Sequence, residues 1–127
     1  MAEKLIMLDT NLLVGVFRNQ DRAIQLLEQY SQEKFCLNPI TKGEFLYGAR
    51  NTKEFQNILQ KLNAFPELTL SRKSSVYFSS IIEQHTISRH IKIPDALIAA
   101  ICLAYEVPLL TLNQKDFNFI EGLILLQ

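Results

Sequence analysis

Four acidic residues stand where a folded α/β chain could bring them together. They are Asp9, Glu44, Asp95 and Asp116. Asp9 directly follows the apolar run 5–8, and a buried strand gains nothing from ending in a charge. Carboxylates that converge on one site raise one another's pKa, so they need a cation to stay ionised together. Oxygen ligands favour Mg²⁺ or Mn²⁺ over zinc, and no cysteine–histidine cluster competes for a softer metal.

Three of these acids also have ordinary structural explanations. Glu44 stands three residues after Thr41, which fits a helix-capping box. Asp95 follows Pro94 near a predicted helix start, where its charge could complement the helix dipole. Asp116 could belong to a turn. Each signal is weak alone, and the four together favour a metal site.

Predicted strands alternate with predicted helices along the chain. The strands are expected at 4–8, 34–38, 67–70, 108–112 and 123–127. The helices are expected at 11–17, 21–32 (with Asp21 as N-cap), 39–51, 52–65, 74–90 and 94–106. Strands that are apolar throughout indicate a parallel sheet covered on both faces, so we expect a three-layer α/β/α fold with five parallel strands. Ligands of such sheets bind beyond the carboxyl ends of the strands, where Asp9 lies.

Composition sets further bounds. The chain has 127 residues, which predicts a single domain over 1–127. Basic and acidic residues balance at 13 each, so net charge does not indicate a nucleic-acid or membrane-surface binder. Cys36 and Cys102 lie in apolar runs and are expected to be buried, reduced thiols. Without a signal peptide or a membrane-length apolar run, the expected location is the cytoplasm.

Four ordered motifs carry a resemblance to a known family. The segments "LDTNLL", "ITKGEFLYGA", "IPDALIAA" and "TLNQKDF" resemble the PIN domain, and within it the ribonuclease toxins of VapBC-type toxin–antitoxin pairs. The similarity extends from Leu5 to Leu126. It implies a five-stranded parallel sheet and a Mg²⁺- or Mn²⁺-dependent endoribonuclease that hydrolyses RNA phosphodiesters.

The resemblance also assigns roles to residues. Asp9 and Asp95 would be the principal metal ligands, Asp116 would complete the metal shell, and Glu44 would be a ligand or hold the attacking water. Four polar residues match the family's supporting positions: Thr10, Asn11, Thr111 and Asn113. Some relatives carry a further acid where this chain has Ala99, which leaves a second metal ion open. Five cations could contact the RNA backbone or simply be solvated: Lys42, Arg50, Arg89, Lys92 and Lys115.

Partners follow from the same resemblance. A small antitoxin encoded nearby and a homodimer are expected, with no membrane association. Apolar residues of the early helices could line an antitoxin groove or belong to the core: Leu12, Leu13, Val16, Phe17 and Tyr47. Three alternatives remain open: an RNA-processing nuclease that is not a toxin, a non-cutting RNA-binding protein, and a haloacid-dehalogenase-like phosphatase. The phosphatase would use Asp9 as nucleophile, but it needs an aspartate where this chain has Asn11.

Overall fold

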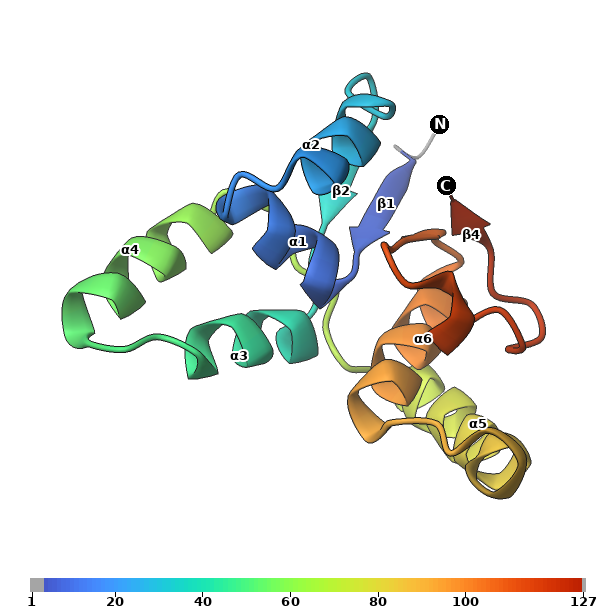
Figure 1. Ribbon diagram of the computed structural model, residues 1–127. Helices are drawn as coiled ribbons and strands as arrows, with labels where there is room; N and C mark the ends of the chain where they lie inside the picture. Colours follow the sequence, from blue (N-terminus) through green and yellow to red (C-terminus); the bar gives the residue numbers. More distant parts are fainter. Residues whose placement is uncertain (1–3, 127) are drawn as a thin grey trace.

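The computed structural model describes residues 4–126 and contains one parallel sheet (Figure 1). Its strands, in the spatial order β2-β1-β3-β4, are β1 (Leu5–Leu8), β2 (Lys34–Cys36), β3 (Leu109–Leu110) and β4 (Leu125–Leu126). The helices are α1 (Thr10–Phe17), α2 (Asp21–Glu28), α3 (Pro39–Tyr47), α4 (Thr52–Leu62), α5 (Arg72–Arg89), α6 (Ile93–Tyr105) and the short 3₁₀ helix η1 (Gln114–Asp116). The predicted α/β fold with a parallel sheet is confirmed.

The strand predicted at 67–70, which would have given the sheet five strands, is wrong. Residues 67–70 form only an isolated parallel bridge, in which Glu67 pairs with Leu37. The N–H of Leu37 donates to the carbonyl of Pro66 at 2.9 Å, and the N–H of Leu68 donates to the carbonyl of Leu37 at 2.8 Å. Ser71 then caps α5, so the segment must leave the sheet at once, and Leu70 is 52% exposed. A short apolar run between a proline and a helix cap therefore has no room to become a strand.

The central strand β1 divides the core into two halves. Ile6 and Leu8 pack into one apolar cluster with residues of α1, α2 and α4. Met7 points to the opposite face and packs into a second cluster with α5 and α6. Alternate residues of a strand face opposite sides, so one strand supplies both clusters. Figure 1 shows the resulting layers, with α1 and α2 on one side of β1 and α5 and α6 on the other.

Helices α1 and α2 are held close together by a small residue. A Cβ atom added at Gly15 would lie 2.8 Å from the Cβ of Ala23 and 2.9 Å from Oε1 of Gln20. Asp21 does not cap α2 as predicted, because the backbone carbonyl of Gln20 already accepts the first helical hydrogen bond, from Ile24 at 3.0 Å. Asp21 is the first helical residue instead, where its charge still complements the helix dipole.

Both cysteines are buried free thiols, as predicted. Burial raises the pKa of Cys36 to about 12 and the pKa of Cys102 well above its ordinary value. A thiol in that state is not a nucleophile, so cysteine chemistry plays no part in the site. Among the described residues, no helix has the length and apolar character needed to cross a membrane.

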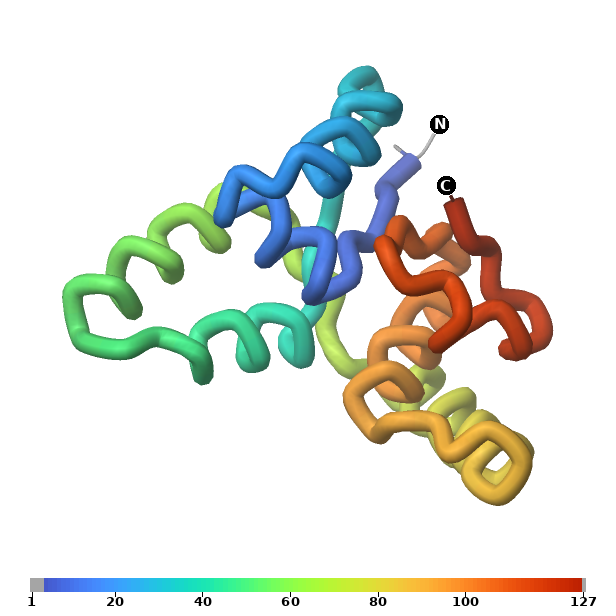
Figure 2. Tube along the Cα trace, viewed as in Figure 1, coloured from blue at the N-terminus to red at the C-terminus, as the bar shows by residue number. Residues whose placement is uncertain are grey.

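Helices α3 and α4 project from the rest of the molecule, as the trace in Figure 2 shows. The base of α3 is fixed to the sheet by Asn38, whose side chain is fully buried. Its Oδ1 accepts the N–H of Thr41 at 2.9 Å, and its Nδ2 lies 3.2 Å from both Oγ1 of Thr41 and Sδ of Met7. Asn38, not Thr41, is therefore the N-cap of α3, which removes the capping box as an explanation of Glu44.

Replacing Asn38 with alanine should lower the free energy of unfolding by about 2–3 kcal/mol, because a helix cap and buried hydrogen bonds are lost together. The matched control is Asn51→Ala, which removes the exposed N-cap of α4 and should cost only about 1 kcal/mol. Urea unfolding of both variants measures the difference. Equal losses would show that burial of the Asn38 amide contributes nothing beyond the cap.

Candidate active site

Asp9 is a buried carboxylate at the carboxyl end of β1. It is 4% exposed and caps α1. Its Oδ1 accepts the N–H of Thr10 at 2.9 Å, and its Oδ2 accepts the hydroxyl of Thr111 at 2.6 Å. Burial raises the pKa of Asp9, the two hydrogen bonds oppose that rise, and the charges of Glu44 and Asp116 add to it. The charge is thus held in place but not neutralised by a cation.

A chain of hydrogen bonds links Asp9 to Asp116. The hydroxyl of Thr111, which donates to Asp9, also accepts the backbone N–H of Asn113 at 3.0 Å. The side-chain amide of Asn113 donates to Oδ2 of Asp116 at 2.7 Å. Asp116 is the last residue of η1. It therefore lies in a turn-like segment and also orients its carboxylate toward the site, so its two explanations are compatible.

A second chain links Asp9 to Glu44. The backbone N–H of Thr10 donates to Asp9, while its Oγ1 lies 2.8 Å from Oε1 of Glu44 and 3.1 Å from Oγ1 of Thr41. Thr41 is fully buried and is held by Asn38. Glu44 lies in the second turn of α3, not at its start, and it is exposed. The carboxylate is therefore oriented by Thr10 but remains open to solvent.

Asp95 reaches the same region from the first turn of α6. It is half-buried and makes no capping hydrogen bond with its side chain. Its pKa is raised to about 6, first by burial and then by the charges of Asp9 and Asp116, with a smaller rise from Glu44, while Lys92 opposes the shift. Carboxylates influence one another in this way only at short range. The structure therefore brings the four predicted acids to one end of the sheet.

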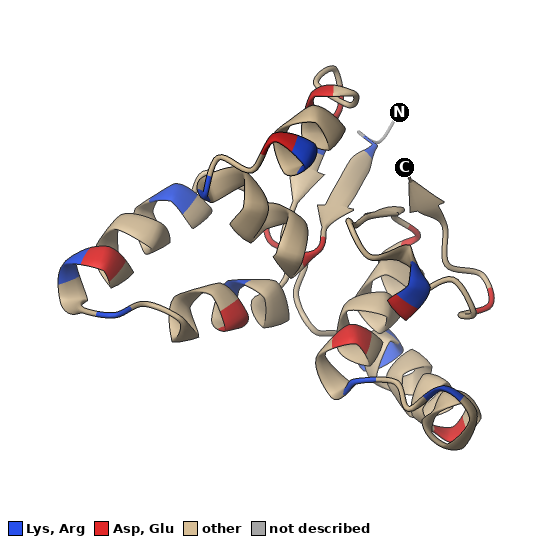
Figure 3. Cartoon of the chain, viewed as in Figure 1, with Lys and Arg blue, Asp and Glu red and all other residues tan. Residues whose placement is uncertain are grey.

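The remaining predicted residues are placed less uniformly. Asn11 is exposed, and its side chain makes no hydrogen bond within residues 4–126. Lys42 pairs with Glu67 at 3.6 Å and Arg50 with Glu54 at 3.1 Å, so both cations already have partners. Figure 3 shows lysine and arginine spread over the molecule rather than gathered on one face.

The other three predicted cations have different surroundings. Lys92 interacts with Asp95, and Lys115 lies beside Asp116. The guanidinium of Arg89 lies 5.1 Å above the ring of Phe119, which His85 also contacts edge-on. Their RNA contacts stay predictions.

Sequence reasoning missed Asn38 and Thr41, which support Thr10 from behind. The signal was present in "NPIT", because asparagine followed by proline is a common helix start. The helix predicted at 39–51 did place Thr41 inside the helix, but the sequence did not show that its hydroxyl would contact Thr10.

Thr111→Val should lower RNA cleavage by roughly 10- to 100-fold, the range found for residues that orient metal ligands. Valine keeps the shape of threonine but removes the 2.6 Å hydrogen bond to Asp9. Thr111→Ser, which keeps the hydroxyl, is the matched control and should retain most of the activity. Cleavage rates of the two purified variants decide the point, and equal rates would remove Thr111 from the site.

The donor atoms available here suit a hard divalent ion. All are carboxylate or hydroxyl oxygens, and burial together with nearby negative charge makes the ionised forms of Asp9 and Asp95 costly without a cation. As the side chains are placed, residues 4–126 contain no group of three or more histidine, cysteine, aspartate or glutamate side chains arranged to hold one ion. The chemistry fits Mg²⁺ or Mn²⁺. The position where some relatives carry a further acid is occupied by Ala99, which is packed in the core.

Comparison with known proteins decides the family. The PIN domain model matches residues 6–122. This chain belongs to the PIN domain family. The predicted resemblance is confirmed, and it favours a nuclease over the phosphatase alternative.

Individual relatives agree with this PIN assignment. The chain is 28% identical to Ribonuclease VapC of Rickettsia bellii, over 93% of this chain and 92% of that protein. It superposes on VapBC2 from Rickettsia felis, solved bound to a promoter DNA fragment, with a TM-score of 0.80 and 25% identity over 96% of this chain and 97% of the other. A toxin–antitoxin complex from Klebsiella pneumoniae gives a TM-score of 0.79 and 26% identity over 96% of each chain.

Proposed function

We propose that this PIN domain is a divalent-metal-dependent endoribonuclease and the toxin of a VapBC-type toxin–antitoxin pair. One observation carries the proposal. The buried carboxylate of Asp9 is joined by hydrogen bonds to Glu44 through Thr10, and to Asp116 through Thr111 and Asn113. Such an arrangement has no value for packing, and the similarity to Ribonuclease VapC supports the assignment.

In this proposal Asp9, Asp95 and Asp116 hold the Mg²⁺ or Mn²⁺. A bound divalent ion lowers the pKa of a water molecule and neutralises charge on the phosphate. Thr10 and Thr111 keep Asp9 ionised and oriented by donating to its two oxygens. Glu44, exposed and aligned by Thr10, would accept a proton from the attacking water as the water oxygen bonds to phosphorus. The phosphorus–oxygen bond to the leaving group then breaks, and the leaving oxygen takes a proton from solvent.

The separation of the carboxylates agrees with this assignment. The pKa values of Asp9 and Asp95 are raised first by burial, and the charges of the neighbouring acids add to that rise. Side chains that repel stay apart until a cation neutralises them. Asp116 and Glu44 are only partly buried or exposed, so both can adjust their rotamers at little cost.

An antitoxin is part of the proposal, because the Klebsiella pneumoniae relative was solved as a toxin–antitoxin complex. A groove of about 540 Å³ between α1, α3 and α4 is a place for it, lined by Phe17, Phe45 and Ile58 among others. Leu12 and Leu13 do not contribute, since both are buried in the core. Tyr47 is 95% exposed, which is unusual for so large a side chain and fits a partner contact. A homodimer remains a proposal.

Expression in cells tests the toxin assignment. The unsubstituted chain should arrest growth, and co-expression of the small protein encoded beside it should relieve the arrest. Purified chain with Mg²⁺ should cut total RNA at sites that end-mapping identifies. RNA cleavage without growth arrest would favour an RNA-processing nuclease, and growth arrest with RNA left intact would contradict the nuclease itself.

A further inference from the structure

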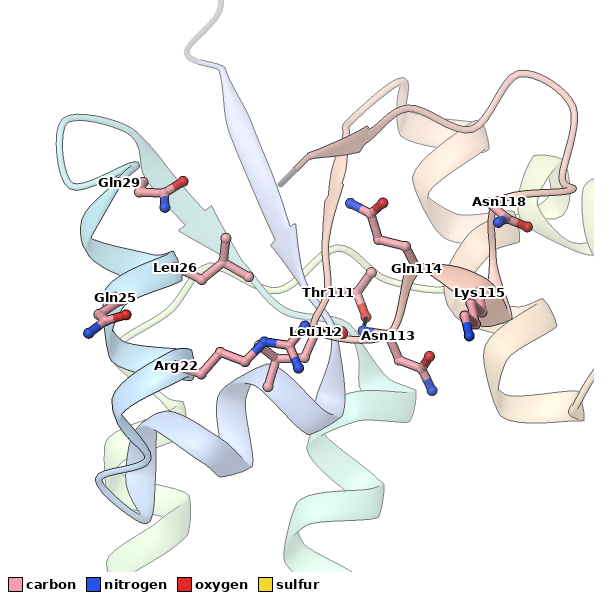
Figure 4. Close-up of a pocket in the computed structure, with 10 residues that line it drawn as sticks. All are labelled: Arg22, Gln25, Leu26, Gln29, Thr111, Leu112, Asn113, Gln114, Lys115 and Asn118. Carbon is pink, nitrogen blue, oxygen red and sulfur yellow. Dashed lines mark hydrogen bonds between the residues drawn. The ribbon is translucent and has the colours of Figure 1, made fainter.

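A second groove, of about 970 Å³, opens between α2 and the segment that follows β3 (Figure 4). Arg22 and Leu26 of α2, and Gln29 directly after it, extend toward the groove in the close-up. Residues 111–115 and Asn118 form the opposite side. The volume is at the upper end of the range for small-molecule sites, so a short stretch of polymer fits better than a single small ligand.

This groove is continuous with the candidate active site. Thr111, which donates to Asp9, and Asn113, which donates to Asp116, both line it. The groove therefore adjoins the acidic residues through these two side chains. Any inference about its occupant follows from what the remaining lining residues can bind.

The charge of the groove is opposite to that of the active site. Arg22 and Lys115 line it, and none of its lining residues is acidic. Nη2 of Arg22 donates to the carbonyl of Leu112 at 3.3 Å, which leaves most of its five N–H groups available. A polyanion repelled by the carboxylates thus finds cations directly beside them.

Amide side chains dominate the polar lining. They are Gln25, Gln29, Asn113, Gln114 and Asn118. Asn113 and Gln114 already donate to Asp116 and to the carbonyl of Leu126. Gln25, Gln29 and Asn118 are exposed and make no side-chain hydrogen bond within residues 4–126. Free amides carry both donors and acceptors, which is what the edges of unpaired bases require.

We propose that this groove binds the single-stranded RNA next to the scissile phosphate. Arg22 and Lys115 contact phosphates, and Gln29 and Asn118, on opposite walls, contact base edges. Single-stranded RNA fits these amides better than a duplex, because the major-groove base edges of A-form RNA lie in a deep, narrow groove that side chains cannot read. The inference rests on the proposed ribonuclease function and adds to it which residues choose the cleavage site.

Binding is tested apart from cleavage in the full chain carrying Asp9→Asn. A fluorescent single-stranded RNA of mixed sequence is titrated at several salt concentrations and followed by anisotropy. Adding Arg22→Gln and Lys115→Gln removes two phosphate contacts, which should weaken binding about 25-fold at 0.1 M salt and make the salt slope shallower by about 1.4. The matched control, Arg72→Gln with Lys73→Gln on α5, makes the same charge change outside the groove and should bind normally.

Arg22 also needs a test that separates charge from structure, because it contacts the carbonyl of Leu112. Arg22→Lys keeps a cation, so it should recover most of the RNA affinity and the original salt slope. If the Arg22→Lys variant binds RNA as weakly as the Arg22→Gln variant does, the contribution of Arg22 is structural, and the proposed phosphate contact is contradicted.

Base recognition has a different readout. Gln29→Ala with Asn118→Ala, in the otherwise unsubstituted chain, should broaden the set of sites cut in total RNA and leave the salt slope unchanged. Gln56→Ala with Asn63→Ala makes the same substitutions on the exposed face of α4 and should leave the cleavage pattern intact. An unchanged pattern in both variants contradicts base recognition by this groove.

The outcomes separate the two proposals. If the chain cuts RNA but the groove variants bind like the α5 control, the groove inference is wrong and the nuclease stands. If the groove variants lose the antitoxin and keep their RNA affinity, the groove is a protein site, which also overturns the inference. If the chain neither binds nor cuts RNA, the proposed function fails and the inference fails with it.

Discussion

Asp9→Asn is expected to reduce RNA cleavage by about 10³-fold or more. The substitution removes a charge that the proposal gives to the metal ion, whose effect on the transition state is several kcal/mol. Since each 1.36 kcal/mol is a factor of ten in rate, a loss of about 4 kcal/mol gives three orders of magnitude. Single-turnover cleavage of a labelled RNA with saturating Mg²⁺ measures it.

The same variant should stay folded. Because burial raises the pKa of Asp9, ionising this carboxyl costs more in the folded chain than in the unfolded chain, and asparagine removes that cost. The asparagine carbonyl can still accept the N–H of Thr10, and its amide can donate to the hydroxyl of Thr111, which then acts as acceptor. We expect urea unfolding at pH 7.5 to show no loss of stability.

A matched substitution controls for general effects of losing a carboxylate. Asp21→Asn makes the same chemical change at an exposed position in the first turn of α2. Its cleavage rate should remain within about twofold of the unsubstituted chain, because an exposed dipole contact contributes at most about 1 kcal/mol to stability and nothing to the site. Full activity in Asp9→Asn would remove Asp9 from the mechanism.

Much of the fold follows from local sequence patterns. The apolar run before Asp9 correctly indicated a strand whose carboxyl end carries a polar residue. Helical periodicity located all six α-helices, because each has an apolar face that is buried against the rest of the fold. The strand expected at 67–70 failed because a run of four residues cannot show whether a hydrogen-bonding neighbour is within reach along its whole length.

Helix caps were harder to predict than helix bounds, as α3 shows: its start at Pro39 was predicted, but its N-cap was not. Thr41 and Glu44 have the spacing of a capping box, but Asn38 also precedes a helix-initiating proline, and only one residue can be the cap. Burial decides the competition, since the amide of Asn38 also contacts Met7 of β1. That contact joins residues 31 positions apart and is invisible to local spacing.

The candidate site could likewise be predicted only in part from the sequence. Residue types and order suggested which acids gather, because carboxyl ends of parallel strands share one edge of the sheet. They did not show that Thr10 would reach Glu44 while its neighbour Asn11 faces solvent. Nor could they show that Lys42 would pair with Glu67, which lies in a distant segment. Side-chain partners depend on tertiary geometry, and charge alone does not predict them.

Mg²⁺ or Mn²⁺ is expected to raise the thermal unfolding temperature by about 10 °C at pH 7.5. An ion at about 100 times its dissociation constant stabilises the folded chain by about 2.7 kcal/mol. For a domain of this size, each 1 kcal/mol shifts the midpoint by about 4 °C. Calorimetry or circular dichroism, with the ion and with a chelator, measures the shift without any RNA.

The stabilisation of the folded chain by Mg²⁺ or Mn²⁺ should increase with pH. The pKa of Asp95 rises from 3.8 to about 6, and the pKa of Asp9 rises as well. Groups whose folded pKa is raised contribute stability that is fully present below the unfolded pKa and is lost as pH rises through the folded pKa. The metal-free chain should therefore lose stability between about pH 4 and pH 7, as Asp95 ionises, and the raised pKa of Asp9 adds a loss of the same sign.

The ion reverses that loss, because it binds the ionised carboxylates and competes with protons for them. Its stabilising effect should thus be small at pH 5 and large at pH 7.5. Asp95→Asn should raise the stability of the metal-free chain at pH 7.5 and reduce the response to Mg²⁺, whereas Asp21→Asn should change neither. A response to Mg²⁺ that is equal at both pH values, or unchanged in Asp95→Asn, would mean that the ion binds elsewhere and that repulsion among these acids is relieved by protons alone.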